Sequence, residues 1–144
     1  MGKTHTKMFV GNKRVKRITV IDPFIGSKNV RDPKVTFEDR IPEKTTYDLV
    51  SICSPTFTHY KFYERLSDRS GAFLVEKPPT LSLEESLKME RSAQRRRQII
   101  GCAFVERFNP LIRRLYESKK LPNSNAHYVF ERIFPFPNQP WYQD

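Results

Sequence analysis

The sequence is poor in the residues that most often bind metals or form disulfides. It contains 2 cysteines and 3 histidines among 144 residues. Cys53 and Cys102 each lie inside an apolar stretch, and neither belongs to a closely spaced pair of the kind that binds zinc or performs redox chemistry. We interpret both as reduced, buried, small hydrophobic residues. His5, His59 and His127 show no ligand spacing, so no metal site is expected.

The sequence also lacks a long apolar run. No stretch approaches the roughly 18 residues that a membrane-spanning helix needs. The first residues, Met1-Gly2-Lys3-Thr4, are not followed by the apolar core of a secretory signal. We therefore expect a soluble, cytoplasmic chain with no membrane partner.

Positive charge, in contrast, is abundant. Lys and Arg number 26 against 16 Asp and Glu, which gives a formal net charge of +10. The cations form three groups: Lys3, Lys7, Lys13, Arg14, Lys16 and Arg17; then Lys88, Arg91, Arg95, Arg96 and Arg97; then Arg113, Arg114, Lys119 and Lys120. Such groups attract polyanions, either nucleic acid or the pyrophosphate of a dinucleotide. No nucleic-acid-binding motif accompanies them, so solvated basic edges are the simpler interpretation and nucleic acid is not the expected partner.

Strand and helix patterns alternate along most of the chain. Apolar or β-branched runs predict strands at 17–21, 35–37, 49–53, 73–75 and 98–105, and helical spacing predicts helices at 3–9, 59–66, 82–97 and from 109 onward. Ser82 and Glu85 form a capping box, and Asn109 caps the last helix. This alternation predicts an α/β fold with a parallel sheet covered on both faces.

A break at 121–125 separates this pattern from one more predicted strand, at 126–134. Proline-rich residues follow that strand. We predict a first domain at 1–122 and, at 123–144, the first strand of a second α/β domain.

Gly2 and Asp22 have a spacing that suits dinucleotide binding. Gly2 opens a predicted helix, and Asp22 ends the strand that follows it. In a dinucleotide-binding unit the helix N-terminus faces the pyrophosphate, and an acid about 20 residues further on accepts hydrogen bonds from a ribose. Two alternatives stay open: Asp22-Pro23 is an ordinary turn, or Gly2-Lys3-Thr4 is the end of a phosphate-binding P-loop.

Three later segments are more specific. They are DLVSICSPTFTH at 48–59, LVEKP at 74–78 and GCAFVERFNP at 101–110. In this order and spacing they resemble the glucose-fructose oxidoreductase and inositol dehydrogenase family (Gfo/Idh/MocA) of NAD(P)-dependent oxidoreductases. The resemblance implies a Rossmann-like parallel sheet. The family's first strand and earlier loop glycines would precede Met1, so the sheet is expected to lack its usual first, central strand.

The resemblance also implies cofactor contacts. Asp22 would hold the adenosine ribose, which favours NAD, while the nearby cations leave NADP open. The other implied cofactor-binding residues are Gly2, Ser54, Pro55, Thr56, His59, Glu76, Lys77 and Arg107. Considered without the family, 54–59 is a strand-end turn with a histidine on a packed helix face, and Arg107 forms an ion pair with Glu106.

One catalytic residue, Lys77, is implied. A lysine ammonium can hydrogen-bond a substrate hydroxyl, stabilise developing negative charge on its oxygen and help relay its proton. The Lys77–Pro78 peptide bond is expected to be cis, as in the family. The alternative interpretation is a solvated lysine at a strand end.

The activity implied is hydride transfer between a nicotinamide cofactor and the hydroxyl of a sugar, sugar nucleotide or polyol. The family's downstream Asp and His have no evident counterparts, because only His127 and Asp144 follow Lys77. We expect the 144-residue chain alone to be inactive or nearly so, and the full-length form to be a homo-oligomer. The alternatives are a non-catalytic nucleotide-binding remnant and a basic nucleic-acid-binding module.

Overall fold

The structure, a computed structural model, describes residues 1–23 and 31–117. The chain divides into two compact units, Met1–Phe104 and Val105–Asp144. The predicted domain boundary at 122, the predicted strand at 126–134 and His127 lie outside the described residues, so they stay predictions.

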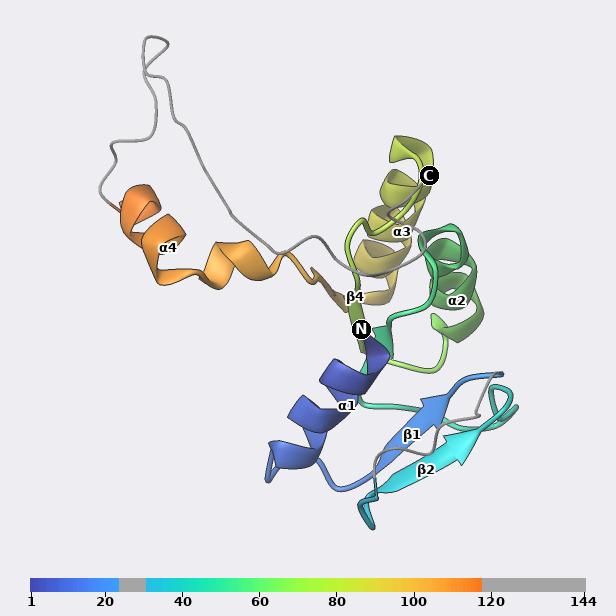
Figure 1. The fold of residues 1–144 in the computed structure, drawn as a ribbon. Helices are drawn as coiled ribbons and strands as arrows, with labels where there is room; N and C mark the ends of the chain where they lie inside the picture. Colours follow the sequence, from blue (N-terminus) through green and yellow to red (C-terminus); the bar gives the residue numbers. More distant parts are fainter. Residues whose placement is uncertain (24–30, 118–144) are drawn as a thin grey trace, which may run out of the picture. The chain divides into compact units, whose positions relative to one another are not determined.

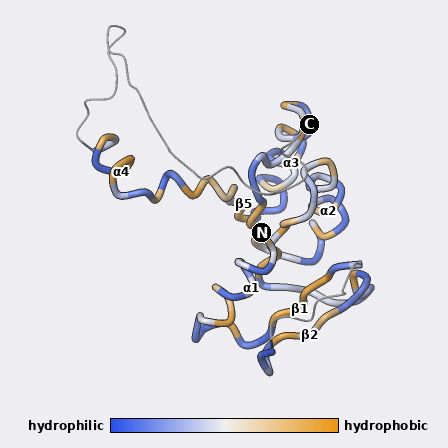
Figure 2. The backbone as a smooth tube through the Cα atoms, viewed as in Figure 1, coloured by the Kyte–Doolittle hydropathy of each residue, from blue (hydrophilic) through white to orange (hydrophobic). Residues whose placement is uncertain are grey.

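A helix and two parallel strands form the first part of unit Met1–Phe104. Helix α1 spans Gly2–Gly11, and strands β1 (Ile18–Ile21) and β2 (Val35–Glu38) follow it. The two strands pair in parallel from Ile18 opposite Val35 to Ile21 opposite Glu38 (Figure 1). Figure 2 shows apolar residues along these strands and hydrophilic residues in the turns beside them. The β-branched run that predicted β1 therefore forms a strand.

The second sheet has the order β3-β4-β5, with all neighbours parallel. Its strands are β3 (Val50–Ile52), β4 (Ala72–Val75) and β5 (Ile99–Cys102). A short 3-10 helix, η1 (Thr56–Thr58), and helix α2 (His59–Leu66) connect β3 to β4, and helix α3 (Leu83–Arg96) connects β4 to β5. The predicted α/β class with parallel strands is confirmed. In the described parts of the chain no ladder joins this sheet to β1 and β2.

The hydrophobic core forms where α2 and α3 meet the second sheet. Its buried members are Ile41, Ile52, Tyr63, Leu66, Phe73, Val75 and Met89. The Tyr63 and Phe73 rings pack edge to face with centroids 5.0 Å apart, and Tyr63 Oη donates a hydrogen bond to Gln98 Oε1 at 3.0 Å. The helix predicted at 59–66 from its apolar spacing is confirmed, since His59, Tyr63 and Leu66 are buried and Phe62 is partly buried against the core.

Helix α3 begins at the predicted capping box. Ser82 Oγ accepts a hydrogen bond from the Glu85 amide at 3.2 Å, and the Glu85 carboxylate accepts one from the Leu81 amide at 3.3 Å. The helix ends beside Arg97, which has a left-handed backbone (φ 55°) and donates its amide to carbonyl groups of the last turn. The arginines of the last turn also suit the negative end of the helix dipole.

The strand predicted at 98–105 is shorter than expected. It ends at Cys102, because its partner β4 ends at Val75 and the Phe104 amide turns back to the Cys102 carbonyl. Residues Val105–Phe108 instead form a 3-10 helix, η2, at the start of the second unit. In the same unit α4 spans Pro110–Glu117, and Asn109 Oδ1 accepts from the Leu111 amide at 3.0 Å, which confirms the predicted cap.

Candidate functional site

The carboxyl ends of β3 and β4 bring two predicted segments together. Ser54 follows β3 by two residues, and Glu76 and Lys77 follow β4 directly. Because the strands are parallel neighbours, these segments leave the sheet at the same edge, and the Glu76 amide donates to the Ile52 carbonyl at 2.9 Å. Open parallel sheets bind ligands at this edge.

His59 fastens the two segments to each other. Its side chain is buried. Nε2 lies 2.8 Å from the carbonyl oxygen of Ser54. Nδ1 lies 3.1 Å from the carbonyl oxygen of Pro78 and 3.2 Å from that of Pro79. A neutral imidazole donates from one nitrogen only, so one of the two sides receives the N–H at a time. His59 is thus buried and contacts both loops through their backbone carbonyl oxygens.

The turn at 54–58 has its own hydrogen bonds. Thr58 Oγ1 lies 2.6 Å from Ser54 Oγ and donates to the Pro55 carbonyl at 2.7 Å. Pro55 is exposed, whereas Ser54 and Thr56 are half-buried. These contacts hold Ser54 at the strand end next to the segment that carries Lys77.

Lys77 is exposed, and its peptide bond to Pro78 is cis, as predicted. Its amide donates to Glu76 Oε2 at 3.2 Å. In the described residues its ammonium has no hydrogen-bond or ion-pair partner. The cation is thus available to a ligand at the end of β4.

Glu76, in contrast, is buried and bonded to a residue that sequence reasoning missed. His5, on α1, has Nε2 3.0 Å from Glu76 Oε1 and Nδ1 2.7 Å from Ser51 Oγ on β3. One helix side chain therefore reaches the ends of two strands that lie 46 and 71 residues away in sequence. The available signal was the place of His5, one turn after Gly2, on the helix predicted to follow a phosphate loop.

Cys53 lies against the same histidine. Its Sγ is 3.4 Å from His5 Nδ1 and 3.6 Å from Ser51 Oγ. Burial raises the pKa of the Cys53 thiol, and the Glu76 carboxylate raises it further. Burial and the same carboxylate also raise the pKa of Cys102. Both cysteines are free, but the prediction that they are buried is wrong, because each is only half-buried at the end of its strand.

Both thiols should therefore react slowly with alkylating agents at neutral pH. A raised pKa leaves less thiolate, which is the nucleophile, at any pH below it. We expect alkylation by iodoacetamide to be slower in the folded chain than in urea at pH 7, and the folded rates to climb most steeply above the ordinary pKa of a cysteine. Mass spectrometry of peptides containing Cys53 or Cys102 measures each rate. Equal rates with and without urea at pH 7 would contradict this expectation.

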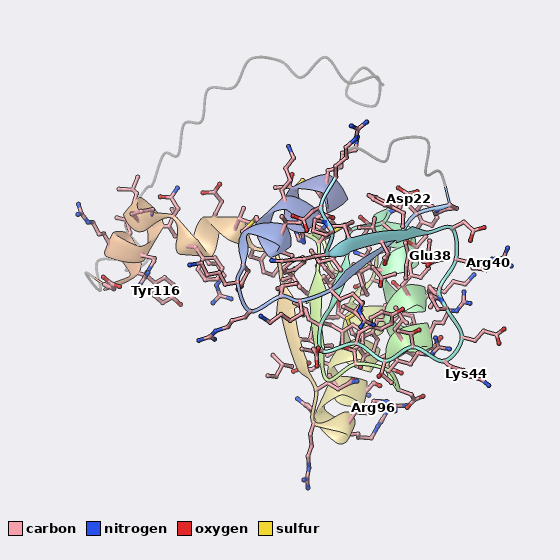
Figure 3. All side chains as sticks on the ribbon, turned by 90° about the horizontal axis from the view of Figure 1, so that it is seen from below. Asp22, Glu38, Arg40, Lys44, Arg96 and Tyr116 are labelled. Atoms are coloured by element: carbon pink, nitrogen blue, oxygen red, sulfur yellow. The ribbon has the colours of Figure 1, made fainter. Side chains whose placement is uncertain are left out.

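Asp22 lies at the end of β1, next to Glu38 at the end of β2 (Figure 3). Its amide donates to the Glu38 carbonyl at 3.0 Å, and its side chain is exposed. Two carboxylates at neighbouring strand ends attract hydroxyl donors and repel phosphate.

Gly2 is the first residue of α1. Met1 supplies no side-chain cap, and the first turn contains no acidic residue. A Cβ placed on Gly2 would lie 3.8 Å from Cys53 Cβ, which is an ordinary contact, so space alone does not demand glycine here. The uncapped amides and the dipole make the start of α1 suitable for an anion.

Arg107 is exposed and belongs to η2 in the second unit, whereas the other predicted site residues belong to the first unit. In the same segment the Asn109 amide group donates to Glu106 Oε2 at 3.1 Å. A cofactor contact of Arg107 stays a prediction.

The second basic group is partly paired within the molecule. Lys88 Nζ is 2.7 Å from Glu84 Oε1, which lowers the pKa of Glu84, and Arg96 pairs with Asp68. A surface groove between α2 and α3 contains both these cations and the carboxylates of Glu64 and Asp68. This mixture of charges favours a solvated edge over a nucleic-acid site.

Residues 1–23 and 31–117 contain no group of three or more His, Cys, Asp or Glu side chains that could hold a metal ion. No helix within these residues is long and apolar enough to cross a membrane.

Comparison with known proteins agrees with this geometry. A profile described as an oxidoreductase family with an NAD-binding Rossmann fold, Gfo/Idh/MocA, matches residues 5–104. The chain belongs to this family. The match contains Asp22, Ser54, His59, Glu76 and Lys77, and the family resemblance seen in the sequence is confirmed.

Two curated relatives of this family member are dehydrogenases. Inositol 2-dehydrogenase of Rhizobium meliloti is 28% identical over 114 residues, which are 76% of this chain and 34% of that protein. UDP-N-acetylglucosamine 3-dehydrogenase of Acidithiobacillus ferrooxidans is 34% identical over 89 residues, which are 62% of this chain and 28% of that protein. The chain thus spans about a third of the length of these relatives.

Solved structures share the fold. A Klebsiella pneumoniae protein described as an oxidoreductase aligns with a TM-score of 0.67 at 23% identity, over 83% of this chain and 37% of that one. A Sinorhizobium meliloti protein described as a myo-inositol dehydrogenase gives a TM-score of 0.61 at 23% identity, over 83% and 38%. At this identity the likeness concerns the fold alone.

Proposed function

We propose that this chain binds a nicotinamide dinucleotide and forms part of an oxidoreductase that transfers hydride to or from the hydroxyl-bearing carbon of a sugar, sugar nucleotide or polyol. The observation that carries the proposal is the edge where β3 and β4 end. There Lys77 is exposed and its cation has no partner among residues 1–23 and 31–117, the neighbouring Glu76 carboxylate is buried, and His59 contacts both supporting loops.

The residues present fit a dinucleotide. The uncapped start of α1 suits a pyrophosphate, and the exposed Asp22 carboxylate suits the two hydroxyls of a ribose. Asp22 and the nearby Glu38 carboxylate would repel a 2′-phosphate, so we propose NAD as the preferred cofactor, with NADP the weaker ligand. Gly2, Ser54, Pro55 and Thr56 are proposed to line the cofactor's path.

Lys77 is the proposed catalytic residue. The nicotinamide, when bound, supplies the hydride acceptor or donor. In the oxidation direction, the ammonium of Lys77 would donate a hydrogen bond to the substrate oxygen and stabilise its developing negative charge, while the O–H proton passes to a general base other than Lys77. The C–H bond would break as the carbonyl forms, with its hydride passing to the cofactor, and in reduction the same ammonium would polarise the carbonyl while the proton returns from that base.

Turnover is proposed to require acid–base groups in addition to those of residues 1–23 and 31–117. Lys77 is the one candidate acid or base that is both exposed and without a partner at this edge of the described residues. We therefore propose dinucleotide binding, with little or no turnover, as the activity of the chain alone. A cytoplasmic location and a homo-oligomeric full-length form accompany this proposal.

A thermal melt of the purified chain with millimolar NAD, NADP or neither tests the proposal. A ligand that binds only the folded state stabilises it by about 2.7 kcal/mol at a hundredfold excess over Kd. We expect NAD to raise the melting temperature more than NADP does, and Asp22→Asn to reduce or reverse that preference because it removes one repelling charge. No shift with either dinucleotide would overturn the proposal.

The matched control is Asp68→Asn. Asp68 is an exposed carboxylate that precedes β4, so it lies at the opposite end of that strand from Lys77. This variant should keep the wild-type preference for NAD. A similar change in both variants would show that net charge, and not the position of Asp22, sets the preference.

A further inference from the structure

His5 is the point where α1 is joined to the ends of two strands. Its side chain is 11% exposed, and that of Glu76 is 7% exposed. Three polar groups lie against the imidazole: Ser51 Oγ on β3, Cys53 Sγ directly after β3, and Glu76 Oε1 directly after β4. The ring is thus enclosed by hydrogen-bonding partners from the edge that carries Lys77.

The direction of each hydrogen bond follows from the chemistry of the partners. An ionised carboxylate only accepts, so the imidazole donates from Nε2 to Glu76 Oε1. In the neutral imidazole, Nδ1 then accepts from the Ser51 hydroxyl at 2.7 Å. The other carboxylate oxygen, Oε2, accepts from the amide of Lys77. Both oxygens of Glu76 are therefore occupied, one by His5 and one by the backbone of Lys77.

We propose that His5 is a positioning residue, which fixes the Glu76 carboxylate and through it the backbone of Lys77 for the nicotinamide half of the dinucleotide. This inference rests on the proposed function. Hydride transfer requires the reacting atoms to lie within about 3.5 Å of each other, so a substrate held by Lys77 places the nicotinamide at this edge. The adenosine half lies at the other end of the ligand, at Asp22, and does not depend on His5.

The test compares two ligands by isothermal titration calorimetry on the full chain. NAD has both halves, whereas AMP has only the adenosine half. We expect His5→Leu to weaken NAD binding about tenfold, the factor that corresponds to losing one charge-assisted hydrogen bond, and to leave AMP affinity within about twofold. His5→Gln keeps a donor and an acceptor on a flexible chain, so it should restore most of the NAD affinity.

Two further variants keep the test decisive. Lys7→Leu changes an exposed residue on the same helix to the same apolar side chain, and it should leave the ratio of the two affinities unchanged. Ser51→Ala removes the hydroxyl at Nδ1 with little change in volume, and it should weaken NAD by about threefold even if His5→Leu does not fold.

The outcomes separate the two proposals. The positioning role would be overturned if His5→Leu weakened the affinities for NAD and AMP equally. It would also be overturned if NAD affinity were unchanged in both His5→Leu and Ser51→Ala. In either case, NAD binding by the wild-type chain would still support the proposed function. A wild-type chain that binds neither ligand would overturn both.

Discussion

Replacing Phe73 by alanine is expected to lower the free energy of unfolding by about 3–5 kcal/mol. The Phe73 side chain is 2% exposed, at the middle of the core between the sheet and α2. The substitution removes its edge-to-face contact with Tyr63 and leaves a cavity that the surrounding strands cannot fill. Urea denaturation followed by circular dichroism measures the loss.

Phe57→Ala provides the matched control. Phe57 lies in η1 and is 71% exposed, so the same substitution there should change the unfolding free energy by less than about 0.5 kcal/mol. Similar losses in the two variants would show that Phe73 does not occupy the core position described.

His59→Phe is expected to lower the free energy of unfolding by about 1–3 kcal/mol, because a buried carbonyl that loses its N–H donor costs about that much. Phenylalanine keeps an aromatic ring but cannot donate to the carbonyls of Ser54, Pro78 or Pro79. Urea denaturation again gives the magnitude, and NAD titration of the variant should show weaker binding because the loops around Lys77 are no longer tied together.

Tyr60→Phe is the control on the same helix. The Tyr60 hydroxyl donates to Glu64 Oε1 at 3.3 Å in an exposed position, so its removal should cost less than about 0.5 kcal/mol. If His59→Phe were as stable as Tyr60→Phe, the imidazole would contribute only its packing.

Local sequence patterns predicted the elements whose boundaries depend on nearby residues. The β-branched run of β1, the apolar face of α2 and the cap of α3 each arise within a few residues of chain, and each is present. The end of β5 was predicted too late, because that boundary depends on where β4 stops pairing. No pattern within 98–105 contains this information.

The candidate site divides in the same way. The motif around Lys77 and the turn at Ser54 were found in sequence, and the structure brings them together through His59. His5 was missed because its partners lie on two distant strands, and a single histidine in a short helix has no spacing pattern to reveal them. The roles of these residues in cofactor binding are predictions that the NAD and AMP titrations test.

The separate pairing of the two sheets has a consequence for dynamics. Within the described residues, β1 and β2 pair only with each other, and a two-stranded sheet has little stability of its own. The amide hydrogens of this pair should therefore exchange with solvent sooner than those of β4, which has a partner on both sides. Because Asp22 is attached to that looser pair, a dinucleotide held there would slow exchange in β1 and β2 far more than in the second sheet.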